Sequence, residues 1–152
     1  MFHVVDDSEM LREMLVDMIE SYDCNVMTFA SASEYLEYVR SDAFKAPSAV
    51  LTDVHMPQMS GYEMMEQVLA INPSIRFAIL SGEPDIPARY KDKVCLFLGK
   101  PYTGDQIQNM IHIFKQCELN SASSPATGEH RLCDRSMFNL PSSCNCPKDA
   151  CS

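Results

Sequence analysis

The sequence is poor in basic residues and contains no long apolar run. It has 12 Lys and Arg against 21 Asp and Glu, for a formal net charge of −9, and the excess of acid falls entirely within residues 1–118. Such an acidic chain should repel nucleic acid and anionic membrane surfaces. No apolar run reaches the roughly 18 residues of a membrane span, and the first residues lack the basic region of a signal peptide. We therefore expect a cytoplasmic protein that binds neither nucleic acid nor membrane.

Seven cysteines are present. In the cytoplasm, free thiols or metal ligands are a better explanation for them than disulfides. Cys24 adjoins an expected strand, Cys95 lies within one, and Cys117 ends an expected helix. All three are most simply small core or helix residues. A length of 152 residues with a hydrophobic fraction of 46% predicts one domain with a real core.

Short apolar runs alternate with amphipathic segments along the first 118 residues. Strands are expected at 2–5, 25–29, 48–52, 75–80 and 94–98, and helices at 8–22, 31–40, 60–71 and 103–117. Prolines at 84 and 87 predict only a short fourth helix over 84–93. The alternation is that of an α/β protein, (βα)5, with helices on both faces of a doubly wound parallel sheet of strand order 2-1-3-4-5.

Polar side chains follow four of the five expected strands. Asp6 and Asp7 come after the first, Asp53 after the third, Ser81 after the fourth, and Lys100 after the fifth. The carboxyl ends of parallel strands meet at one edge of a sheet, where ligands bind. Three carboxylates, a hydroxyl and an ammonium group at that edge suit a divalent cation and a phosphoryl group.

The order of these motifs resembles the receiver domain of two-component response regulators. The shared features are Asp-Asp, then Asp53 with Met-Pro three residues on, then Ser-Gly, then Lys-Pro, and they cover residues 1–118. The resemblance implies a flavodoxin-like fold. It also implies phosphoryl transfer to the chain from a sensor histidine kinase or a phosphotransfer protein, with Mg²⁺ as the cofactor.

The resemblance assigns a role to each residue at the expected edge of the sheet. The phosphoacceptor is Asp53; the Mg²⁺ ligands are Asp6, Asp7, Asp53 and the backbone carbonyl of His55; the groups that hold phosphoryl oxygens are Ser81 and Lys100.

Four further positions match ones that have roles in the family. Phe97, with Ser81, occupies the position of a switch aromatic, although a plain core phenylalanine explains it equally well. His55 and Glu83 hold the two positions that tune the lifetime of the acyl phosphate. Pro101 corresponds to a proline with a cis peptide bond.

The last third, residues 119–152, reads as a linker followed by a cysteine-rich tail. Residues 120–128 are rich in Ser, Ala, Pro and Thr. Zinc is one ligand that the tail could hold, with its candidate donors being His130, Cys133, Cys144, Cys146 and Cys151. Their spacing is not a standard pair, so free thiols in a disordered tail, disulfides or a segment that docks on a partner remain open.

We therefore expect a stand-alone receiver that catalyses only its own phosphoryl transfer and dephosphorylation, and that signals by contact with an output protein the sequence does not identify. One alternative is a metal- or redox-sensing protein in which the tail is the functional element and the receiver a scaffold. Another is an aspartyl-phosphate hydrolase of the haloacid dehalogenase type. That family has a second acid two residues after the nucleophile, where this chain has His55.

Overall fold

The computed structural model describes residues 1–123, with side chains described through residue 118. Five strands and four helices alternate along this part of the chain. In order they are β1 (Phe2–Val5), α1 (Glu9–Glu20), β2 (Val26–Phe29), α2 (Ala32–Arg40), β3 (Ala49–Asp53), α3 (Gly61–Ile71), β4 (Phe77–Ser81), β5 (Leu96–Gly99) and α4 (Gly104–Ser123).

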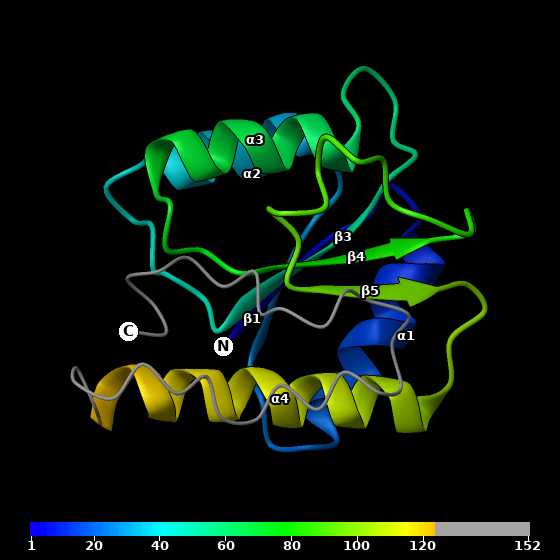
Figure 1. Cartoon of the computed structure of the whole chain (residues 1–152), viewed down its shortest axis with the longest axis vertical. Helices are drawn as coiled ribbons and strands as arrows, with labels where there is room; N and C mark the ends of the chain where they lie inside the picture. The colour runs from blue at the N-terminus through cyan, green and yellow to red at the C-terminus, as the bar shows by residue number, and fades with distance from the viewer. Residues whose placement is uncertain (124–152) are drawn as a thin grey trace.

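The strands form one parallel sheet of order β2-β1-β3-β4-β5, which confirms the predicted topology. Helices α2 and α3 cover one face of the sheet, and α1 and α4 cover the other (Figure 1). In the register, Asp53 of β3 lies opposite Leu80 of β4, and Ser81 lies opposite Gly99 of β5. The carboxyl ends of the strands therefore meet at a common edge.

Side-chain caps fix where the helices begin. Ser8, Ser31 and Ser60 each accept a hydrogen bond from a backbone N–H in the first turn of α1, α2 and α3. At α4, the hydroxyl of Thr103 and the amide oxygen of Gln106 accept bonds from each other's backbone N–H groups. These contacts satisfy amide groups that lack partners within a helix. They place each helix directly after the loop that leaves the site edge of the sheet.

The core has two layers because successive strand residues face opposite sides of the sheet. Val4 and Leu51 pack against α1 and α4, whereas Val5 and Val50 pack against α2 and α3. Three cysteines are buried and form no disulfide, as the sequence predicted: Cys24, Cys95 and Cys117.

The connection between β4 and β5 departs from the prediction. Residues 82–95 contain no helix, so the expected short fourth helix is absent. Proline at 84 and at 87 removes two backbone donors within four residues. Beyond them the chain forms only separate turns, in which the N–H of Tyr90 bonds to the carbonyl of Pro87 and that of Lys93 to the carbonyl of Tyr90. The last helix also differs, because α4 continues to Ser123 instead of ending near Cys117. The domain boundary at residue 118 remains a prediction.

Across the part of the chain that is described, no helix combines the length and apolarity that a membrane crossing requires.

Candidate functional site

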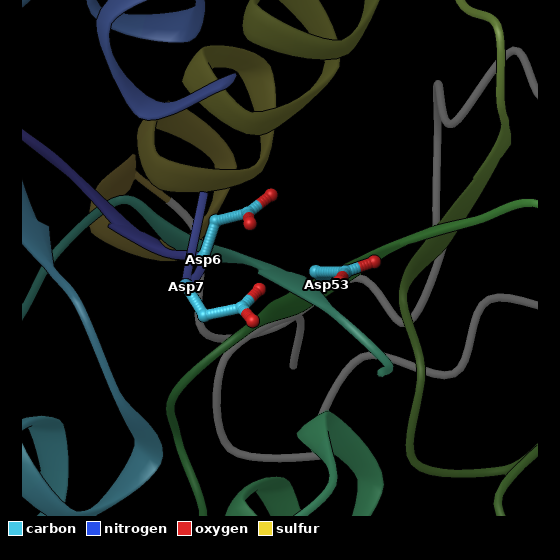
Figure 2. Close-up of side chains that lie close together, drawn as sticks. All are labelled: Asp6, Asp7 and Asp53. Atoms are coloured by element: carbon cyan, nitrogen blue, oxygen red, sulfur yellow. The ribbon is translucent and has the colours of Figure 1, made fainter. Parts of the chain in front are cut away.

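Three carboxylates gather at the carboxyl edge of the sheet. Asp6 and Asp7 follow β1, and Asp53 is the last residue of the neighbouring strand β3. One oxygen from each lies within 4.8 Å of the others. Figure 2 shows the side chains of Asp6 and Asp7 reaching from the end of β1 toward Asp53. The structure therefore brings together the three acidic residues that the sequence singled out.

The carboxyl group of Asp6 is held inside the protein. It is 1% exposed, and its Oδ1 accepts the backbone N–H of Ser8 at 2.9 Å. Burial raises the pKa of Asp6. The negative charges of Asp53 and Asp7 add to this, whereas the Ser8 hydrogen bond and the Lys100 charge oppose it.

The second oxygen of Asp6 identifies what this group of carboxylates can hold. Oδ2 is buried and has no hydrogen-bond partner among the described residues. A buried polar atom without a partner costs free energy, and the cost is greater beside like charges. A divalent cation would pair with this oxygen and offset the repulsion, so the donor set fits a hard, oxygen-binding ion.

Asp53 is not an exposed residue at the rim of the protein. It is 8% exposed, and its Oδ1 lies 2.9 Å from Nζ of Lys100. Lys100 follows β5 and precedes Pro101 through a cis peptide bond, the form that the resemblance implied. A carboxylate beside cation ligands and a lysine can act as a nucleophile toward an anionic phosphoryl group, because positive charge offsets the repulsion between the two.

Gly61 sets how closely α3 approaches the end of β3. Its backbone N–H donates to the carbonyl of Val54 at 3.0 Å, and a Cβ at this position would overlap the carbonyl oxygen of Asp53. Only glycine therefore fits here. No role for Gly61 was predicted from the sequence, although a glycine directly after the Ser60 cap was a signal of this close contact.

Ser81 and Glu83 lie where the chain leaves β4. The Ser81 side chain is buried, and its Oγ accepts the backbone N–H of Glu83 at 3.0 Å. The carboxylate of Glu83 in turn lies 2.9 Å from Nε2 of His55. The exposed ring of His55 thus pairs with Glu83, and this side chain is not part of the carboxylate cluster of Asp6, Asp7 and Asp53.

Phe97 is buried in the layer that faces α2 and α3. Both interpretations from the sequence fit this position, so its role as a switch remains a prediction. The candidate zinc ligands of the tail lie outside the described residues: His130, Cys133, Cys144, Cys146 and Cys151.

Comparisons with known proteins point to one family. Residues 2–112 match the family model of the response regulator receiver domain. The C4-dicarboxylate transport transcriptional regulatory protein DctD of Rhizobium meliloti is 29% identical over 107 residues, which are 68% of this chain and 23% of DctD. The response regulator protein TodT of Pseudomonas putida is 31% identical over 131 residues, 84% of this chain and 56% of TodT.

A solved structure gives the same result. The crystal structure of a response regulator receiver domain protein from Clostridium thermocellum has a TM-score of 0.64 and 25% identity, and covers 76% of this chain and 96% of that one. This chain spans 23% of the length of DctD and 56% of that of TodT, so it matches only part of each regulator. The five-stranded fold, the carboxylate cluster and the family match over residues 2–112 show that the chain belongs to the response regulator receiver family.

Proposed function

We propose that Asp53 accepts a phosphoryl group from a phosphohistidine on a sensor kinase or phosphotransfer protein. The observation that carries this proposal is the placement of Asp53 between two further carboxylates and Lys100, whose Nζ is 2.9 Å away. Receiver domains are signalling modules rather than enzymes that act on a separate substrate. The phosphorylated receiver is then the signal, and a protein contact reads it.

Magnesium is the cation that we assign to the carboxylate cluster. Its ligands would be oxygens of Asp6, Asp7 and Asp53 with the backbone carbonyl of His55, and receiver domains bind Mg²⁺ at such an acidic pocket. When bound, the ion supplies positive charge that offsets charge on the transferring phosphoryl group. The buried, unpartnered Oδ2 of Asp6 supports this assignment.

The chain's own residues would carry the transfer as follows. An oxygen of Asp53 forms a bond to phosphorus while the N–P bond of the donor histidine breaks and the imidazole leaves with its electron pair. The ammonium of Lys100 and the hydroxyl of Ser81 then hold phosphoryl oxygens, one as a point charge and the other as a hydrogen-bond donor. Gly61, which has no Cβ, lets α3 begin directly against the backbone of Asp53.

Mapping the acceptor tests the proposal. With a small phosphodonor and Mg²⁺, the wild type should gain one phosphoryl group, which chemical trapping and mass spectrometry should place on Asp53. Asp53→Asn should gain none, because an amide does not attack phosphorus. Asp42→Asn removes an exposed carboxylate outside the site and should label like the wild type. Undiminished labelling of Asp53→Asn would place the acceptor elsewhere.

A further inference from the structure

The helix-free segment 82–95 is held against α3 by a charged contact. Arg89 donates from Nε and Nη2 to the two carboxylate oxygens of Glu66, both at 3.1 Å. Lys93 Nζ lies 3.3 Å from Oε1 of the same carboxylate. These two cations lower the pKa of Glu66 against the effect of desolvation. A bidentate pair of this kind fixes the relative orientation of the two side chains as well as their distance.

An aromatic contact lies one helical turn earlier on α3. The rings of Tyr62 and Tyr90 are stacked, with centroids 4.6 Å apart and planes only 3° from parallel. The guanidinium of Arg89 lies 5.3 Å from the centroid of the Tyr90 ring. Ile86 of the same segment is buried against the α3 layer. We call residues 82–95 the strap. Its contacts with Tyr62 and Glu66 of α3 are together called the grip.

Both ends of this arrangement adjoin the phosphoryl site. On α3, Tyr62 directly follows Gly61, which touches the carbonyl of Asp53. At the start of the strap, the backbone N–H of Glu83 is bonded to Oγ of Ser81. A displacement of the Ser81 hydroxyl toward a phosphoryl group on Asp53 is therefore passed through this bond to Glu83. The grip of Glu66 and Tyr62 on the strap opposes that displacement.

One atom within the grip lacks the hydrogen bond that burial calls for. The hydroxyl of Tyr62 is buried, and no partner for it exists in the part of the chain described with side chains. Burial raises its pKa to about 12, and the charges of Glu83 and Asp85 contribute to the rise. A buried hydroxyl without a partner is a local cost. That cost lowers the net stability of the packing between α3 and the strap.

We propose that the contacts of Glu66 and Tyr62 with the strap set the free-energy cost of phosphorylation, because the strap must loosen from α3 when Ser81 turns to the phosphoryl group. This inference rests on the proposed function, since it concerns regulation of the same site. Coupling between two sites is reciprocal. Loosening the strap by mutation therefore strengthens binding of a phosphoryl group at Asp53, just as phosphorylation loosens the strap.

The test measures binding of beryllofluoride, a phosphoryl analogue, to the full chain with Mg²⁺ by titration calorimetry. Glu66→Gln and Arg89→Gln both weaken the grip, so both should tighten binding, by about two- to fivefold for a partly exposed pair. The two variants change the charge of the protein in opposite directions. A simple effect of charge on an anionic ligand would move their affinities in opposite directions.

Asp85→Asn is the matched control for Glu66→Gln. It removes one negative charge and breaks the Asp85–Lys91 pair, which lies within the strap and does not reach α3. Its affinity for beryllofluoride should equal that of the wild type. In the wild type, amide hydrogens of residues 84–93 should exchange faster once the analogue is bound.

The possible outcomes separate the two proposals. If the wild type binds beryllofluoride but Glu66→Gln and Arg89→Gln bind it equally well, more weakly or with opposite shifts in affinity, the inference is overturned. The proposed function is then left in place. Equal tightening in Asp85→Asn also overturns the inference, because the effect would then not depend on contacts with α3. A wild type that binds no beryllofluoride contradicts the proposed function itself.

Discussion

The side chain of Lys100 reaches across the end of β4 to Asp53. Asp53 ends β3, Lys100 follows β5, and β4 lies between these two strands, yet Nζ of Lys100 is 2.9 Å from Oδ1 of Asp53. Ser81, the last residue of β4, is buried at this edge. The lysine thus supplies a positive charge from two strands away.

Replacing this lysine should slow phosphorylation without unfolding the protein. Lys100→Met keeps most of the side-chain stem and removes the charge, so labelling by a small phosphodonor should fall about 10- to 100-fold, the effect of losing one charged hydrogen bond. Lys45→Met, at an exposed position away from the cluster, should label like the wild type. Equal labelling of both variants would show that Lys100 does not act on the phosphoryl group.

Magnesium should raise the melting temperature, because the ion binds carboxylates that are close together only in the folded protein. Asp6→Asn should abolish this shift and also raise the melting temperature without metal, since it removes a buried charge beside Asp53. Asp7→Asn removes an exposed carboxylate of the same cluster, so it should lose the Mg²⁺ shift without that gain. A wild type whose melting temperature ignores millimolar Mg²⁺ would contradict the metal assignment.

Gly61→Ala should destabilise the protein and impair the site together. The added Cβ would collide with the carbonyl of Asp53, so either α3 or the end of β3 must move. We expect a loss of about 1–3 kcal/mol in the free energy of unfolding, with slower labelling in the folded fraction. Gly82→Ala is the matched control, because its Cβ would meet no atom within 4 Å. Urea titrations of the two variants measure the difference.

Local signals predicted most of this architecture. Ser31 and Ser60 indicated where helices begin, and Asp53 and Ser81 indicated where strands end. These features were predictable because helix caps and short apolar strands are encoded within a few residues. The strap was not predictable in the same way. Its path depends on contacts with Glu66, 23 residues before Arg89, which no local pattern reveals.

His3 shows the same limit inside the core. Its ring is fully buried, and Nδ1 lies 3.0 Å from the hydroxyl of Tyr35. Its ring also packs edge-on against Phe29, Tyr38 and Phe44. These partners come from β2, from α2 and from the loop after it. In the sequence, His3 was only one residue of a short strand.

The burial of His3 predicts a loss of stability in acid. Burial, with a contribution from the charged N-terminus, lowers the pKa of His3 from 6.5 to about 4. Between pH 6.5 and about 4, His3 is therefore protonated in the unfolded chain but neutral in the folded protein. The free energy of unfolding is therefore highest, as far as His3 is concerned, above pH 6.5. It declines as the pH falls toward 4, by about 3 kcal/mol in all.

Unfolding free energies of the wild type and His3→Phe at several pH values between 4 and 7 measure this effect. Because phenylalanine does not titrate, the curve of the variant should be flatter, whatever its stability at neutral pH. Parallel curves for the two proteins would show that His3 does not titrate on unfolding in this range.

Shortening the chain to residues 1–118 should leave the receiver folded and able to accept phosphate. The cut removes the last residues of α4 but keeps Phe114 and Cys117, which pack in the core layer shared with α1. It also keeps the Cys117 carbonyl, which lies 3.4 Å from Nη2 of the buried Arg76. We expect a cooperative melt within about 5 °C of that of a 1–123 chain, and labelling at Asp53 in both. If 1–118 aggregates while 1–123 folds, the end of α4 is part of the domain. If neither folds, the receiver needs residues beyond 123, and the boundary at 118 is wrong.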